Sequence, residues 1–187
     1  MKTKTIILGL CTLIFFGLGG FLIIEYYLLI DFIEILRRGW AIPLQILIGI
    51  IYGMASSLIC LFIINREFFK NEKEFYSRKI SYFHLNNVNI VLLSLCAGIG
   101  EEIFFRAALQ PIIGIWLTAI VFVVLHGYVN PWNWRISIYG LVMILIMVGI
   151  GFLYEIAGLI AVIVAHTVID IVLFKNLMNN KDIGEAI

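Results

Sequence analysis

Charged residues are scarce in this sequence. Lys, Arg, Asp and Glu make up 13% of its 187 residues, against about 25% in an ordinary soluble domain, while 63% are hydrophobic and the mean hydropathy is +1.07. The formal net charge is only +1 and there is no dense Lys/Arg tract, which argues against a nucleic-acid partner. The composition excludes an ordinary soluble protein and predicts an integral membrane protein surrounded by lipids.

Cysteine is also rare, and its spacing is uninformative. Cys11, Cys60 and Cys96 lie in apolar runs, without the paired spacing of a metal site or the pattern of a secreted disulfide framework. We therefore interpret them as small apolar packing residues.

Long uncharged runs, in contrast, are abundant. A hydrocarbon core of about 30 Å requires about 20 helical residues, because each adds about 1.5 Å. Four runs meet this requirement: Thr5–Ile24, Trp40–Ile64, Ile136–Tyr154 and Ile156–Phe174. The first follows two lysines and lacks a small-x-small cleavage site, so we expect a retained signal anchor.

The region Ile90–Gly127 is too long for one span. As a single helix it would extend about 57 Å, nearly twice the thickness of the hydrocarbon core. Pro111 and Gly114 are the strong helix breakers in its second half, which predicts a hairpin turn between Gln110 and Gly114 and about six spans in all. The alternative is one helix over Ala107–Leu125 after a re-entrant segment, which gives five spans.

The connecting segments set the expected topology. Glu25–Gly39 and Asn65–Asn89 mix aromatic, aliphatic and charged residues, which is typical of amphipathic helices at the interface. With six spans, ten Lys and Arg residues lie on the side of both termini and two on the opposite side, so the positive-inside rule predicts cytoplasmic termini. We find no internal repeat or linker. The sequence thus predicts an all-α polytopic transmembrane bundle that forms a single domain over residues 1–187.

Ionisable side chains within spans are costly and usually mark function. This chain has six of them: Glu101, Glu102, Arg106, His126, His166 and Asp170. One ion pair or one histidine could serve helix packing alone, but six together favour a functional site.

Their spacing supports this interpretation. Glu102 and Arg106 stand four residues apart with the acid first, which is the favoured orientation of a helical ion pair. Glu101 is then left without an obvious counter-charge, so its carboxylate is free to accept a proton as a general base does. A turn near Gly114 places Glu101 and His126 each about 18 Å from the same end of the molecule, and His166 lies about 16 Å from a turn near Glu155. We therefore predict that three segments bring their polar groups to one layer.

Three motifs stand in the order of a known family. They are Glu101-Glu102-Ile103-Phe104-Phe105-Arg106, Phe122-Val123-Val124-Leu125-His126 and His166-Thr167-Val168-Ile169-Asp170. In this order they resemble the Glu-Glu-x-x-x-Arg, Phe-x-x-x-His and His-x-x-x-Asn/Asp motifs of the CAAX protease and bacteriocin-processing (CPBP, or Abi) intramembrane proteases. The resemblance covers roughly Leu92–Phe174, so residues 88–174 are expected to form the catalytic helices.

The resemblance implies hydrolysis of a peptide bond in small membrane-associated peptides or proteins. Glu101 and His126 would activate a water, Arg106 would hold Glu102, and His166 with Asp170 would complete the site as oxyanion partners. Bacteriocin maturation or self-immunity, at a bacterial plasma membrane, is the role it suggests. Asp170 stands where members that act on prenyl proteins usually have Asn, so the resemblance leaves the substrate open.

The sequence leaves more than one possibility for the cofactor and for the class of function. We favour a glutamate-activated water without a cofactor, because the chain lacks the His-Glu-x-x-His helix of common zinc proteases, but zinc is the competing account. A non-enzymatic immunity or regulatory scaffold and a small ion or proton transporter are the alternative functions. The absence of paired broken helices in two repeated halves counts against a transporter.

Overall fold

A computed structural model of the chain describes residues 2–81, 83 and 85–179, and these ranges contain helices and no strand. The helices are α1 (Lys2–Thr12), α2 (Gly19–Leu22), α3 (Phe32–Arg37), α4 (Ile42–Ile64), α5 (Lys70–Ser81), α6 (Asn87–Glu102), α7 (Gln110–Leu125), α8 (Trp134–Ala157) and α9 (Leu159–Asn179). Three π-helical segments, Leu13–Leu18, Ile23–Tyr27 and Ile103–Leu109, continue or join them, and Glu67–Phe69 is a 3₁₀ turn. The expected all-α bundle is confirmed.

Among the described residues, five helices are long and apolar enough to cross a membrane. They are Thr5–Tyr27, Ile42–Ile64, Asn87–Leu125, Trp134–Ala157 and Leu159–Asn179.

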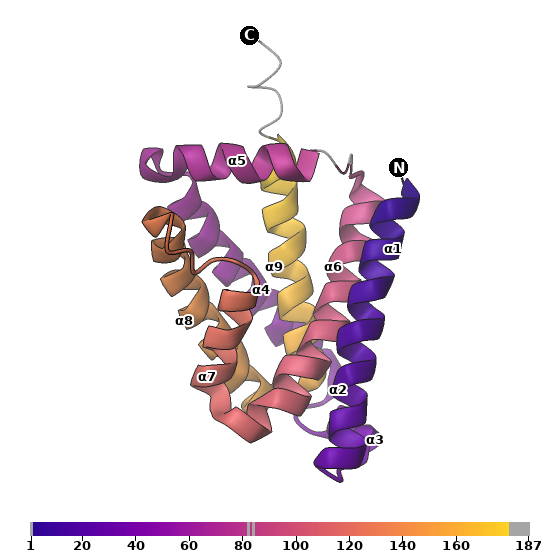
Figure 1. The fold of residues 1–187 in the computed structure, drawn as a ribbon. Coiled ribbons are helices and arrows are strands. Elements are labelled where there is room, and N and C mark those ends of the chain that lie inside the picture. The colour runs from indigo at the N-terminus through magenta and orange to yellow at the C-terminus, as the bar shows by residue number, and fades with distance from the viewer. Residues whose placement is uncertain (1, 82, 84, 180–187) are drawn as a thin grey trace.

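The longest of these helical runs, Asn87–Leu125, folds back on itself at Gly114, as the breakers predicted. Gly114 has φ +80° and ψ 167°, a conformation that favours glycine and interrupts the helix. The returning leg, residues 115–125, is only about 16 Å long by the helical rise. The predicted hairpin is therefore present, but its second leg reaches only about halfway across the bundle (Figure 1) and is too short to be a sixth span, so the described residues contain five candidate spans instead of six.

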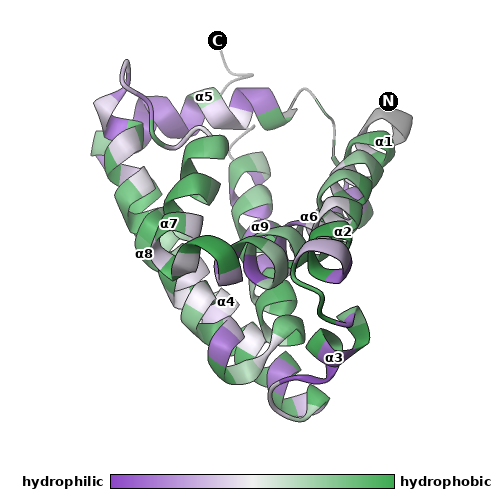
Figure 2. Cartoon of the chain, turned by 60° about the horizontal axis from the view of Figure 1, so that its bottom comes forward, coloured by the Kyte–Doolittle hydropathy of each residue, from purple (hydrophilic) through white to green (hydrophobic). Residues whose placement is uncertain are grey.

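Both ends of the described chain lie on one side of the bundle. Figure 1 shows the start of α1 and the end of α9 at the same end as α5, and α3 at the opposite end. α5 lies across the helices rather than along them, as expected of an interfacial helix. In Figure 2 it is mainly hydrophilic while the long helices are mainly hydrophobic, which fits a lipid-facing bundle with one polar cap.

The two helices α4 and α9 pack closely because small residues line their contact. A Cβ atom built on Gly49 would lie 2.5 Å from the carbonyl oxygen of Ala161, and one on Gly53 would lie 2.7 Å from that of Ala165. Small residues at a four-residue spacing allow this approach of backbones in membrane helices. α9, which carries His166 and Asp170, is thereby held in the middle of the bundle.

The topology can be tested with reporter fusions at Gly39 and Met178. The structure places these positions at opposite ends of the bundle, so the two reporters should report opposite sides of the membrane. We expect Met178 on the cytoplasmic side, because that end has the larger share of Lys and Arg. If both fusions report the same side, the arrangement of the spans is wrong.

Candidate active site

The six predicted residues come from three separate parts of the bundle. Glu101 and Glu102 end α6, and Arg106 lies in the π-helical segment Ile103–Leu109 that follows. His126 comes directly after the last residue of α7, while His166 and Asp170 lie in the middle of α9. π-helical segments are rare and often occur at functional sites.

Glu102 and Arg106 form a fully buried ion pair. The Arg106 Nε donates to Glu102 Oε2 at 3.0 Å, and neither side chain is exposed. The Arg106 Nη2 also lies 3.4 Å from the sulfur of Met147 in α8. The predicted pairing of these two residues is present.

Glu102 has a second partner that the sequence did not predict. Its Oε1 accepts a hydrogen bond of 2.7 Å from the Nδ1 of His166, which joins α6 to α9. One carboxylate thus binds Arg106 on its own helix and His166 on another. Gly98, one turn earlier, permits this approach, because a Cβ there would collide with the hydroxyl of Thr167.

Glu101 faces both histidines. Its Oε2 lies 3.3 Å from the Nε2 of His126 and 4.0 Å from the Nε2 of His166. Asp170 also approaches His166, with Oδ2 at 3.7 Å from Nε2. The three segments therefore meet in one layer, as the depth estimate from the sequence predicted.

The hydrogen bonding of His126 identifies the protonation of its ring. Its Nδ1 lies 2.7 Å from the carbonyl oxygen of Phe122, and a carbonyl can only accept, so Nδ1 carries a hydrogen. In the neutral ring, Nε2 is then an acceptor that faces Glu101. Phe122 fixes the ring further by stacking on it, with centroids 4.1 Å apart.

A cavity of about 250 Å³ adjoins these groups, and we call it the central cavity. Glu101, His126, His166 and Asp170 line it, together with apolar residues of α1, α6, α8 and α9. Glu102 and Arg106 do not. The predicted six thus divide into four residues that a substrate could touch and an ion pair that only positions them.

The geometry gives no support for a metal centre. In the described part of the chain, no group of three His, Cys, Asp or Glu side chains is arranged to hold a metal ion. The Nδ1 of His166 is engaged by Glu102, while the Nε2 atoms of both histidines approach one oxygen of Glu101. The choice between a metal-free and a zinc-dependent mechanism stays a prediction.

Sequence reasoning missed Tyr128. This residue follows His126 by two positions, lines the central cavity and lies with its ring nearly parallel to that of His126, at 6.5 Å between centroids. An aromatic residue in a short loop gives no periodic or motif signal that could have identified it.

Comparisons with known proteins agree with the family that the three motifs resemble. Residues 84–172 match the family model described as "Type II CAAX prenyl endopeptidase Rce1-like". An uncharacterized protein of Bacillus subtilis, YpbD, is 33% identical over 104 residues, which is 54% of this chain and 49% of that protein. The chain thus spans about half the length of this relative. No solved structure matches the chain.

The division between positioning and cavity-facing residues predicts two different mutant phenotypes. Arg106→Ala should lower activity and also lower the thermal midpoint in detergent, because it leaves Glu102 buried without its counter-charge, at a cost of about 3–5 kcal/mol. Glu101→Gln should keep the thermal midpoint close to that of the wild type, since the amide has the same shape, and should abolish turnover. Equal thermal losses in both variants would contradict this division.

Proposed function

We propose that this chain hydrolyses peptide bonds at or within the membrane, because residues 84–172 match the Rce1-like model of type II CAAX prenyl endopeptidases, which is a CPBP family model. The observation that carries the proposal is the convergence of Glu101, His126, His166 and Asp170 on one cavity between membrane helices. Its substrates would be small membrane-associated peptides or proteins. Bacteriocin maturation or self-immunity, at a bacterial plasma membrane, is the biological role that we propose to test first.

The proposed reaction begins with a water in the central cavity that both Glu101 and His126 bind. Glu101 takes a proton from this water as its oxygen attacks the carbonyl carbon of the substrate, and the carbonyl oxygen becomes the oxyanion. Collapse of the tetrahedral intermediate breaks the C–N bond, and the proton passes from Glu101 to the leaving nitrogen. The close approach of Glu101 Oε2 and His126 Nε2 supports their sharing one water.

His166, supported by Asp170, is proposed to stabilise the oxyanion. Held by Glu102 through Nδ1, His166 presents Nε2 to the central cavity between Glu101 and Asp170. In its doubly protonated form, His166 would donate from Nε2 to the oxyanion, and preorganised donors of this kind contribute strongly to catalysis. Asp170, 3.7 Å from the same Nε2, would be a counter-charge of the doubly protonated ring. Glu102 and Arg106 act in this scheme only as positioning residues.

Cleavage by the purified protein tests this proposal. We expect wild-type protein in detergent to cleave members of a panel of fluorogenic apolar peptides, with and without a C-terminal lipid, and the Glu101→Gln variant to cleave none. The matched control is Glu155→Gln, which changes a carboxylate at the far end of α8, where it accepts from Gln110, and should retain activity. No cleavage by any folded preparation would favour the scaffold function instead.

The metal requirement is tested by chelation. With a metal-free glutamate base, exhaustive chelation followed by gel filtration should leave turnover unchanged. A catalytic zinc would lower the pKa of its bound water to about 7, and its removal would abolish turnover until zinc is restored. Elemental analysis of the same samples separates the two cases, because about one zinc per chain, lost together with activity, would falsify the metal-free mechanism.

A further inference from the structure

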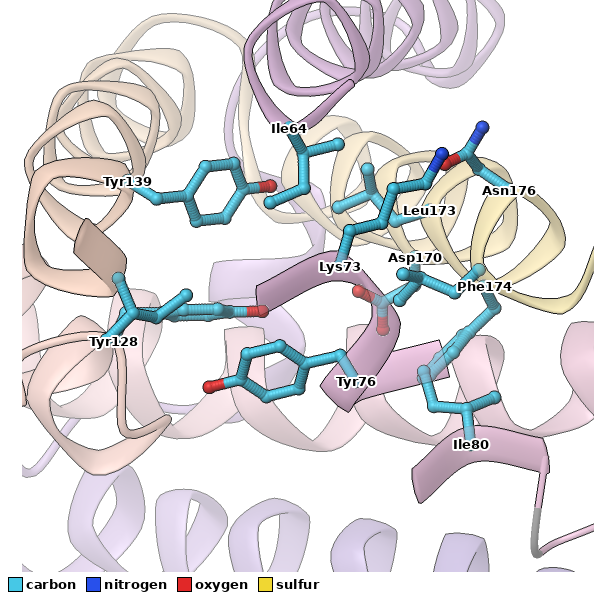
Figure 3. Close-up of a pocket in the computed structure, with 12 residues that line it drawn as sticks. Ile64, Lys73, Tyr76, Ile80, Tyr128, Tyr139, Asp170, Leu173, Phe174 and Asn176 are labelled. Atoms are coloured by element: carbon cyan, nitrogen blue, oxygen red, sulfur yellow. The ribbon is translucent and has the colours of Figure 1, made fainter. Parts of the chain in front are cut away.

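A second cavity, of about 230 Å³, lies under the interfacial helix α5, and we call it the α5 cavity. Tyr76 and Ile80 of α5, Ile64 of α4, Tyr139 of α8 and Leu177 of α9 are among the residues that line it. Figure 3 shows Ile64, Tyr76, Ile80 and Tyr139 around it, with the hydroxyls of Tyr128 and Tyr139 pointing from one wall toward the side of Asp170. The walls are thus mainly apolar, with phenol groups and the polar side chains of Lys73, Asp170 and Asn176 among them.

The α5 cavity adjoins the central cavity. Tyr128, Asp170, Leu173 and Phe174 line both of them. Asp170 and Tyr128 therefore stand at the junction, next to the groups that we propose for catalysis. A peptide bound at His126 and Glu101 would reach the α5 cavity within a few residues, since an extended chain advances about 3.3 Å per residue.

Hydrogen bonds hold α5 in place over the α5 cavity. Ser77 Oγ donates to the carbonyl oxygen of Leu177 at 2.5 Å, which fixes α5 to α9. The Asn133 amide donates to Glu72 Oε1 at 3.2 Å, which fixes α5 to the start of α8. The space beneath α5 is accordingly a built cavity with anchored walls.

Tyr128 is rigidly placed and available as a donor. Its backbone N–H donates to the carbonyl oxygen of Val123 at 3.2 Å, and its own carbonyl packs on Gly140, where a Cβ would lie 2.5 Å from it. Burial raises the pKa of Tyr128, so its phenol stays protonated at neutral pH. Among the described residues, no hydrogen-bond partner is found for its hydroxyl group.

The lining favours a peptide over a lipid tail. A hydrocarbon chain would leave the Tyr128 hydroxyl buried without a partner, and such a group costs about 1–3 kcal/mol. A peptide backbone supplies carbonyl acceptors and apolar side chains at once. The volume, below that of drug-sized pockets, suits one or two residues of an extended peptide.

We propose that the α5 cavity is a second substrate subsite, which binds an uncharged apolar segment of the peptide on one side of the scissile bond. At its junction with the central cavity, Tyr128 donates a hydrogen bond to a backbone carbonyl of this segment. The inference rests on the proposed peptidase function and adds a subsite and a positioning residue to it.

Kinetics of tyrosine variants test the role of Tyr128. With the fluorogenic peptide that the wild type cleaves best, Tyr128→Phe should lower kcat/KM about five- to tenfold, as expected for the loss of one hydrogen bond, while the thermal midpoint stays unchanged. The matched control, Tyr154→Phe, removes a phenol at the opposite end of α8 and should leave kcat/KM unchanged. Wild-type kcat/KM in a folded Tyr128→Phe variant would overturn the role of Tyr128.

Photocrosslinking tests occupancy without turnover. The Glu101→Gln variant is mixed with the same panel of peptides, each carrying a benzophenone on one or the other side of its centre. One of the two label positions should crosslink to α5 at Tyr76 or Ile80, and the other to residues of α1 or α6 that line the central cavity, such as Thr12 or Leu93. Crosslinks confined to α1 and α6 would overturn the subsite.

The crosslinking and cleavage experiments distinguish a lipid in the α5 cavity from a failure of the proposed peptidase function. Labelling of Tyr76 or Ile80 by a photoactivatable phospholipid that apolar peptides do not displace would also overturn the subsite. If the wild type cleaves no peptide while peptides still crosslink to α5, the proposed function fails and the binding site stands.

Discussion

The buried carboxylate of Glu102 is the constraint on which the rest of the site depends. A charge with no exposure is tolerated only when partners surround it, and Glu102 has two: Arg106 on its own helix and His166 on α9. The first partner is local and follows from a four-residue spacing. The second fixes the height and rotation of α9 relative to α6. Satisfying one buried charge therefore also determines where His166 presents its other nitrogen.

Small residues make this electrostatic arrangement sterically possible. α9 is held from one side by Gly49 and Gly53 of α4 and from another by Gly98 of α6, each at a point where a Cβ would meet α9. In a lipid environment, where apolar surface gains little by leaving the solvent, such close packing and interhelical hydrogen bonds supply the specificity of association. The glycines thus belong to the site although none of them contributes a side chain.

Sequence spacing predicted the depth of each polar group along the bundle correctly, but it did not predict which side chains each group would contact. The rise per residue and the breaker at Gly114 were enough to bring Glu101, His126 and His166 to one layer. The same reasoning did not predict the bond between Glu102 and His166, because the rotation of one helix about its axis relative to another depends on packing. The sequence did not predict the position of Tyr128 for a related reason. The path of a short loop depends on contacts such as that with Gly140 and not on periodicity.

The adjacent acids show how one helix can serve two environments. Successive residues on a helix point about 100° apart, so Glu101 and Glu102 face different surroundings and approach different nitrogens of His166. Glu102 turns to the sealed interior, where Arg106 and His166 fix its charge, while Glu101 turns to the central cavity and to His126. Different surroundings assign different roles to two identical side chains, one structural and one open to water or substrate. The arrangement depends on both acids, because Glu102 holds in place the histidine, His166, that lies beside Glu101 at the central cavity.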